Sequence, residues 1–335
     1  MDSHLYQVTA RLSHDDGRVQ QLYRLAVSPA QPQGLAHRLR GGLLLVAALL
    51  LASGLIFWIA ANWQAQSRGF KLGLIEAAVG ICVIVAWLWP RGRIAALLCA
   101  TLALGGLLAY VGQTYQTGAD AWQLFAAWAA LALVWVLPAR SDLLWLVWIG
   151  VAALAILLWF GHLGVWDYLV DEASLVRQRL YLALWLGLGW VPVLIACVPW
   201  ARLSGGMGWW SHRLAQGLML AAWTVLGVLD LFLSNHLAWL VFAGAGVLAL
   251  VVLWVSYRGP IKDFISLCLS VLALDACLMA LVARLLLAAG GDVVADLLLL
   301  TLVGLGCLAG TVTGLLAAQR RRRSRAGRAD AEGGV

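Results

Sequence analysis

Long apolar runs alternate with short polar connections along most of this 335-residue chain. A helix that crosses a membrane needs about 20 predominantly apolar residues. The pattern predicts an all-α, polytopic transmembrane helix bundle of about ten spans. The third, fourth and fifth runs are short, so a re-entrant segment is the alternative there. The ten runs cover residues 41–61, 70–89, 94–111, 121–138, 143–160, 180–199, 214–233, 237–256, 264–287 and 293–317.

Polar segments flank the apolar runs at both ends. In the first one, Leu5, Val8 and Leu12 share one helical face. Short amphipathic helices of this kind could pack on each other, lie on the membrane surface or dock a partner. We therefore divide the chain into a cytoplasmic amphipathic helical appendage at 1–40, spans one to four at 41–138, spans five to ten at 139–318, and a basic, disordered cytoplasmic tail at 319–335.

Composition and charge agree with this architecture. The chain is 63% hydrophobic and 12% charged, a balance typical of a protein surrounded by lipid. Loops on the cytoplasmic side of a membrane carry most of the lysine and arginine. Placing both termini in the cytoplasm assigns 18 of the 23 basic residues to that side. The net charge of +7 is therefore expected to reflect topology and contact with anionic lipid headgroups rather than nucleic acid.

The segment GQTYQTGAD at 112–120 places six hydrogen-bonding side chains within nine residues. The predicted topology puts it on the extracytoplasmic side, together with the end of the first span and the start of the second. Neutral amide, hydroxyl and aromatic groups suit a polar headgroup, a sugar or a partner loop. Folding of the loop against its own helices is the alternative. The candidate ligand-binding residues are Asn62, Gln64, Lys71, Glu76, Gln113, Tyr115, Gln116, Asp120 and Asp275.

Two of these candidates are carboxylates inside predicted spans. Asp275 lies near the middle of the ninth span, and Glu76 lies within the second. A charge at such a depth costs about 2.5–3.5 kcal/mol on insertion scales, so each side chain should face a partner or be protonated. The spacing of Asp275 and Arg284 puts them on opposite helix faces, which excludes a pair within that helix. A functional role and a structural polar contact remain equally open for both carboxylates.

No catalytic sequence motif accompanies the polar residues. The chain contains no HExxH, GxSxG or phosphate-binding loop, and we predict no cofactor and no metal. All six cysteines lie inside apolar runs, where we interpret them as small packing residues. Gly306, Gly310 and Gly314 form a small-residue ladder in the tenth span, typical of close helix packing within the bundle or against a partner.

Two stretches resemble a known family. GLIFWIAANWQ at 54–64, followed by Lys71, and GQTYQTGADAWQLFAAW at 112–128 are similar to the core of a bacterial family of membrane proteins, domain of unknown function 2157. The resemblance covers spans one to four, and the appendage loosely. The usual form of the family has a histidine where this chain has Gln116. The resemblance implies a multi-pass protein of the bacterial inner membrane, often encoded beside a second multi-pass protein, and it implies no activity.

Three hypotheses for the function follow. The first is a transport or ligand-binding membrane subunit with a polar site on the extracytoplasmic side, in which Glu76 and Asp275 would take up protons. The second is a structural subunit of a membrane envelope complex with a second multi-pass protein, favoured by the glycine ladder. The third, an enzyme acting on a lipid-linked substrate through a carboxylate, has the least support, because the chain lacks a catalytic motif. We favour the first hypothesis.

Overall fold

The computed structural model describes residues 35–61, 67–115, 118, 120–161, 173–197, 207–233, 238–258 and 263–332. Within these residues the chain forms ten long α-helices, one short 3-10 helix (η1, Pro90–Gly92) and no strand. The α-helices are α3 (Leu35–Ala61), α4 (Arg68–Leu88), α5 (Arg93–Tyr115), α6 (Ala121–Ala139), α7 (Asp142–Gly161), α9 (Ala173–Cys197), α10 (Trp209–Leu233), α11 (Ala238–Arg258), α12 (Phe264–Ala289) and α13 (Val293–Glu332).

The predicted all-α bundle of about ten spans is confirmed. Nine of the helices in the described part of the chain are long and apolar enough to cross a membrane. The remaining long helix, α9, has 25 residues and contains most of the predicted span at 180–199. The three runs that were predicted to be short form the continuous helices α5, α6 and α7, each of which meets the criterion for a spanning helix.

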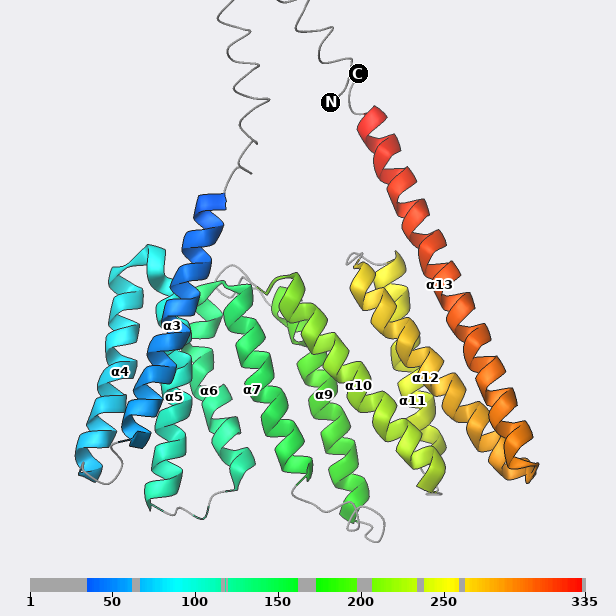
Figure 1. Cartoon of the computed structure of the whole chain (residues 1–335), viewed down its shortest axis with the longest axis horizontal. Coiled ribbons are helices and arrows are strands. Elements are labelled where there is room, and N and C mark those ends of the chain that lie inside the picture. The colour runs from blue at the N-terminus through cyan, green and yellow to red at the C-terminus, as the bar shows by residue number, and fades with distance from the viewer. Residues whose placement is uncertain are drawn as a thin grey trace, which may run out of the picture.

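The helices stand side by side in a long row, alternately up and down (Figure 1). α3 and α4 both pack on α5, and the row continues through α6, α7, α9 and α10 to α11, α12 and α13. The start of α3 and the end of α13 extend from the same side of the row, which we call the side of the chain termini (Figure 1). This arrangement agrees with the even number of spans.

The core lies where α10 meets four other helices, α7, α9, α11 and α12. Trp185 of α9 and Met219 of α10 are almost completely buried there. A Cβ atom on Gly189 would lie 2.4 Å from the sulfur of Met219, so the absence of a side chain lets α9 approach α10 closely. At the two ends of the row the helices are far less covered by other helices. In α13, none of the residues 293–317 is buried.

The structure describes most of the segment after the last apolar run and little of the segment before the first one. α13 continues as a helix as far as Glu332, so it includes the arginine-rich stretch that we expected to be a disordered tail. Most of the predicted appendage, residues 1–34, lies outside the described residues. Its two short amphipathic helices therefore stay a prediction.

Candidate ligand-binding cavity

A cavity of about 870 Å³ lies among α3, α4, α5 and α6, and we call it the α3–α6 cavity. Its volume falls within the range of small-molecule sites, roughly 300–1,000 Å³. Most of its wall is aliphatic. The lining residues are Leu49, Leu51, Ala52, Ser53, Leu55, Ile56, Ile75, Ala78, Ile81, Cys82, Cys99, Leu102, Ala103, Gly105, Gly106, Ala109, Tyr110, Gln113 and Trp128.

Small residues on α5 leave this space open. Ala103, Gly106 and Ala109 face the cavity, between helices α3 and α4 that both pack on α5. A Cβ atom on Gly106 would meet no atom within 4 Å. Because these side chains are too short to reach the opposite wall, the three helices enclose a hollow instead of a packed core.

Trp128 of α6 forms a rigid wall of the cavity. Its indole ring lies directly on Gly105, where an added Cβ atom would be only 2.5 Å from the ring. Its Nε1 donates to the carbonyl oxygen of Thr101 at 2.8 Å. Trp135 donates in turn to the hydroxyl of Thr101 at 2.9 Å. These two bonds fix α6 on α5 and hold the indole at the edge of the cavity.

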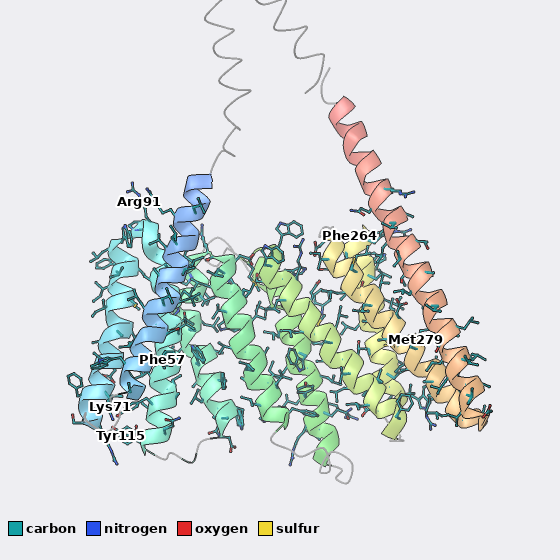
Figure 2. All side chains as sticks on the ribbon, viewed as in Figure 1. Phe57, Lys71, Arg91, Tyr115, Phe264 and Met279 are labelled. Atoms are coloured by element: carbon teal, nitrogen blue, oxygen red, sulfur yellow. The ribbon has the colours of Figure 1, made fainter. Side chains whose placement is uncertain are left out.

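Two polar side chains of the lining, those of Tyr110 and Gln113, lie at the end of the cavity opposite to the chain termini. The hydroxyl of Tyr110 donates to the carbonyl oxygen of Arg68 at 3.0 Å, which ties α5 to the start of α4. Gln113 lines the cavity one turn further along α5. Lys71, which is only 4% exposed, and Tyr115, which is 59% exposed, lie at this same end (Figure 2).

The structure thus brings together part of the predicted site. Gln113 on α5 lines the α3–α6 cavity, and Lys71 on α4 and Tyr115 on α5 lie at the same end of these helices without lining it. Asp120 is half-buried and stands at the N-cap position of α6. The other three candidates from this side, Asn62, Gln64 and Gln116, lie outside the described residues.

The two carboxylates inside the membrane are not brought together. Glu76 is exposed on α4 and is not part of the cavity lining. Asp275 lies on α12, where its carboxyl group interacts with the hydroxyl of Thr311 on α13. Because α4 and α12 stand near opposite ends of the row (Figure 1), a proton path shared by both carboxylates has no support in this arrangement.

Comparison with known proteins connects the cavity to a family. Residues 15–145 match the family "Predicted membrane protein (DUF2157)". The matched segment contains α3, α4, α5 and α6 entirely, and these are the helices that line the cavity. The resemblance predicted from 54–64 and 112–128 is therefore confirmed for this part of the chain. No curated protein and no solved structure matches the chain.

The family match and the helices together establish a multi-pass membrane protein. Its described residues contain no group of three or more histidine, cysteine or acidic side chains that could hold a metal ion. The polar contacts between helices in the described part of the chain include hydrogen bonds and one ion pair, Arg213–Asp263. Several of these were missed in the sequence.

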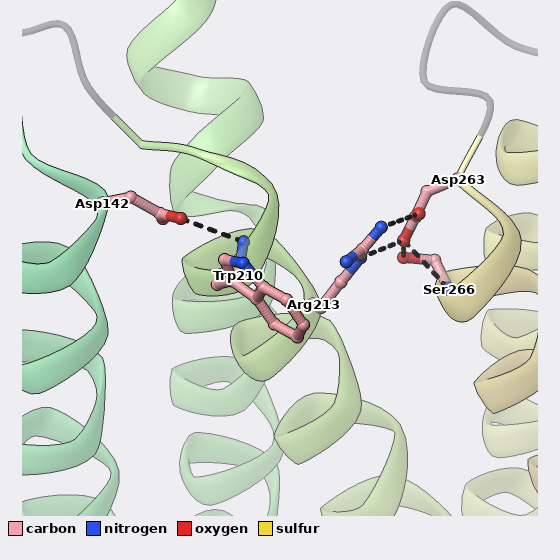
Figure 3. Close-up of polar contacts among 5 residues, drawn as sticks. All are labelled: Asp142, Trp210, Arg213, Asp263 and Ser266. Atoms are coloured by element: carbon pink, nitrogen blue, oxygen red, sulfur yellow. Dashed lines mark hydrogen bonds and ion pairs between the residues drawn. The ribbon is translucent and has the colours of Figure 1, made fainter. Parts of the chain in front are cut away.

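The first missed contact is made by Asp142, at the start of α7 (Figure 3). Its carboxylate accepts hydrogen bonds from the backbone N–H groups of Gly208, Trp210 and Ser211, at 2.9, 3.1 and 3.0 Å. These donors belong to the first turn of α10, where N–H groups lack partners within the helix. Asp142 therefore caps α10 from a neighbouring helix, and its negative charge interacts favourably with the positive end of the α10 dipole.

The second is an ion pair between α10 and α12 (Figure 3). Arg213 donates to both carboxylate oxygens of Asp263, from Nη2 at 2.7 Å and from Nε at 3.0 Å. Asp263 also caps α12 by accepting from the backbone and the hydroxyl of Ser266. Burial would raise the pKa of Asp263, but the hydrogen bonds from Arg213 and Ser266 outweigh it and lower the pKa to about 2.

The third is a pair of buried polar side chains, Gln178 on α9 and Asp230 on α10, which are 3% and 2% exposed. The amide of Gln178 donates to the Asp230 carboxylate. Asp230 was visible in the sequence as an acid near the end of an apolar run. Its partner lies 52 positions away and carries no charge, so no spacing rule pointed to it.

Proposed function

We propose that the chain is a membrane subunit that binds a lipid or another ligand with an apolar chain in the α3–α6 cavity. The carrying observation is the cavity itself, a hollow of about 870 Å³ whose wall is mostly aliphatic and whose lining includes Tyr110 and Gln113 at one end. Cavities of this kind hold an apolar body and orient it by a few polar contacts.

The lining supports an amphipathic ligand in a particular direction. An acyl or isoprenoid chain would lie against Ala103, Gly106 and Ala109 on α5. Its polar group would lie at the end of the cavity that contains Gln113, close to Lys71 and Tyr115. The amide of Gln113 can both donate and accept, and the ammonium group of Lys71 favours an anionic or strongly polar headgroup.

The orientation of the site in the membrane follows from charge. Basic residues are concentrated on the side of the chain termini, which favours a cytoplasmic location for that side. The polar end of the cavity then faces away from the cytoplasm. In a bacterial inner membrane, the ligand would enter from the outer leaflet or the periplasm.

Filling the cavity tests this function. Leucine at Gly106 would project into free space, because a Cβ atom there meets no atom within 4 Å. Displacing only two ligand methylenes costs about 1.6 kcal/mol, which is more than about tenfold in affinity. We expect Gly106→Leu to lower cross-linking of a phospholipid whose acyl chain carries a diazirine by at least about tenfold. The measurement is mass spectrometry of cross-linked peptides, with the full chain in vesicles.

A matched control is available on α7. A Cβ atom on Gly150 also meets no atom within 4 Å, and Gly150 does not line the cavity. Gly150→Leu should therefore leave the cross-linking to α3, α4 and α5 unchanged. Equal labelling of these helices in wild type and Gly106→Leu would show that the phospholipid touches only the outside of the bundle, and the proposal would fail.

A second candidate is a structural subunit of a membrane complex that includes another multi-pass protein. It is favoured by α13, whose spanning window has no buried residue and whose Gly306 and Gly310 have nothing near their added Cβ atoms. Small residues at this spacing permit close approach of another helix. A stoichiometric membrane protein retained with the purified wild-type chain, and no lipid cross-linking in the cavity, would favour this candidate over the first.

A further inference from the structure

A second cavity, of about 680 Å³, lies at the other end of the row among α11, α12 and α13, and we call it the α11–α13 cavity. We propose that it binds one anionic phospholipid from the leaflet on the side of the chain termini. Its lining residues are Leu250, Leu253, Trp254, Tyr257, Arg258, Leu267, Val271, Thr311, Gly314 and Leu315.

The cavity arises from the way α13 leaves α12. The two helices are close near Met279, whose Cε would lie 3.2 Å from a Cβ atom on Gly304. From there they diverge toward the side of the chain termini (Figure 1; Met279 is labelled in Figure 2). Leu267 and Val271 of α12 and Gly314 and Leu315 of α13 line the cavity that lies in this direction.

The length of the cavity suits part of an acyl chain. Along α11 the lining extends from Leu250 to Arg258, a length of about 12 Å at 1.5 Å per residue. The aliphatic wall formed by Leu250, Leu253 and Leu267 is compatible with a hydrocarbon chain.

The chemistry at the open end suits an anionic headgroup. Arg258 is the last residue of α11 and is exposed, and Trp254 and Tyr257 lie within the preceding turn. Tryptophan and tyrosine are enriched where a bilayer meets water, and basic pockets on the cytoplasmic side bind anionic lipids. None of the described lining residues is acidic, so nothing in the wall offsets the charge of Arg258. Beyond the cavity, α13 continues into the arginine run at 320–323.

Two glycines on α13 allow a matched pair of leucine substitutions. Gly314 lines the cavity, whereas Gly306 does not, and an added Cβ atom meets no atom within 4 Å at either position. Gly314→Leu should fill the cavity, and Gly306→Leu should add the same side chain to the same helix without entering it. Arg258→Gln removes the charge and keeps a polar side chain of similar length.

The experiment uses the full chain, purified in mild detergent and titrated with phosphatidylglycerol or phosphatidylcholine while native mass spectrometry counts bound lipids. We expect one phosphatidylglycerol to be retained more tightly than phosphatidylcholine. Arg258→Gln should weaken it by about fivefold, the effect of one basic residue at a membrane surface. Gly314→Leu should abolish the preference for phosphatidylglycerol over phosphatidylcholine, and Gly306→Leu and the cavity-filling Gly106→Leu should leave this preference unchanged.

The last control separates this site from the function proposed above. If Gly106→Leu alone removed the retained phosphatidylglycerol, the lipid would belong to the α3–α6 cavity and this proposal would fall. It would also fall if wild type held both lipids equally, or if Gly314→Leu and Gly306→Leu behaved alike. Should Gly314→Leu fail to fold, Arg258→Gln decides: unchanged preference for phosphatidylglycerol would overturn the proposal.

Discussion

Asp263 is the residue whose charge the structure controls most directly. Its pKa of about 2 lies below the ordinary value of about 3.9 for aspartate. A carboxylate whose pKa is lowered on folding contributes stability above its ordinary pKa and loses it as the pH falls through the folded value. The stability that the charge of Asp263 contributes should therefore be complete above about pH 4 and be lost progressively between about pH 4 and 2.

Asp263→Asn tests this pH dependence. Asparagine still caps a helix well, so the change mainly removes the charge from the contact with Arg213. We expect the free energy of unfolding at pH 6 to fall by at most about 1.5–3 kcal/mol, the usual range for hydrogen bonds to charged groups. The 21% exposure of Arg213 weakens the contact and favours the lower end of this range. The measurement is the thermal unfolding midpoint in detergent at pH 6, 4 and 2.5.

The comparison with the variant isolates Asp263 from its titratable neighbours. Asp142 also interacts electrostatically with Arg213. His212, which precedes Arg213 in the chain, interacts electrostatically with Asp263. These groups remain in both proteins, so the difference in midpoint between wild type and Asp263→Asn should shrink from pH 4 to 2.5. A difference that stays constant over this interval would contradict the low pKa of Asp263.

At the scale of single residues, the sequence predicts positions that depend on near neighbours. An aspartate directly before an apolar run is an N-cap pattern, so the capping role of Asp263, which we had not predicted, depends only on near neighbours. Its ion-pair partner Arg213 lies 50 positions away, and the sequence offers several other arginines on the same side. Only the packing of α10 against α12 selects this one.

Two neighbouring glycines on α5 should respond in opposite ways to an added methyl group, because only one of them lies in the contact between α5 and α6. Gly105 lies under Trp128, so an added methyl group would be 2.5 Å from the indole ring. Gly106 faces the open α3–α6 cavity. Gly105→Ala should destabilise the protein by about 1–3 kcal/mol through overpacking, and Gly106→Ala should be neutral or stabilise it by up to about 1 kcal/mol because alanine favours a helix.

Unfolding of both variants in the same detergent, followed by tryptophan fluorescence, measures this pair. Trp128 should also report directly, since Gly105→Ala must displace its ring. Two variants of equal stability would mean that α5 and α6 can separate without cost. The wall of the cavity would then be softer than the bonds from Trp128 and Trp135 to Thr101 indicate.

At the scale of elements, the sequence was most informative about the helices themselves. Runs of about 20 apolar residues leave few alternatives in a membrane, because every backbone polar group must be satisfied within the segment. Which helices become neighbours is a different question, since lipid-facing and protein-facing surfaces are both apolar. Glu76 and Asp275 illustrate this: each was expected to need a partner, and the structure places them far apart, with Thr311 next to Asp275.

The whole molecule is a row of helices whose middle is well packed and whose two ends are open. Both cavities lie in these open ends, one at α3–α6 and one at α11–α13. Neither was predictable from the sequence, because a cavity is defined by side chains that fail to meet, and the sequence does not show how closely consecutive helices pack. Of the residues that line the first cavity, the sequence had singled out Gln113 as a candidate.

The sidedness of the whole molecule gives the final prediction. The turn between α4 and α5 lies on the side of the chain termini, and the turn between α12 and α13 lies on the opposite side (Figure 1). The positive-inside bias predicts that the first turn lies in the cytoplasm. In intact cells, a membrane-impermeant maleimide should therefore label Asp292→Cys and leave Pro90→Cys unlabelled until the membrane is broken.

The variants are chosen to leave the topology-determining charges in place, since both keep every arginine and lysine. Pro90 and Asp292 are exposed, so access rather than burial decides the labelling. The wild-type chain supplies the background, because its cysteines lie in apolar runs that a charged reagent does not enter. Labelling of Pro90→Cys in intact cells, with Asp292→Cys protected, would show that the protein has the opposite orientation in the membrane. The Arg258 end of the α11–α13 cavity would then face the outer leaflet, and the polar end of the α3–α6 cavity would open to the cytoplasm.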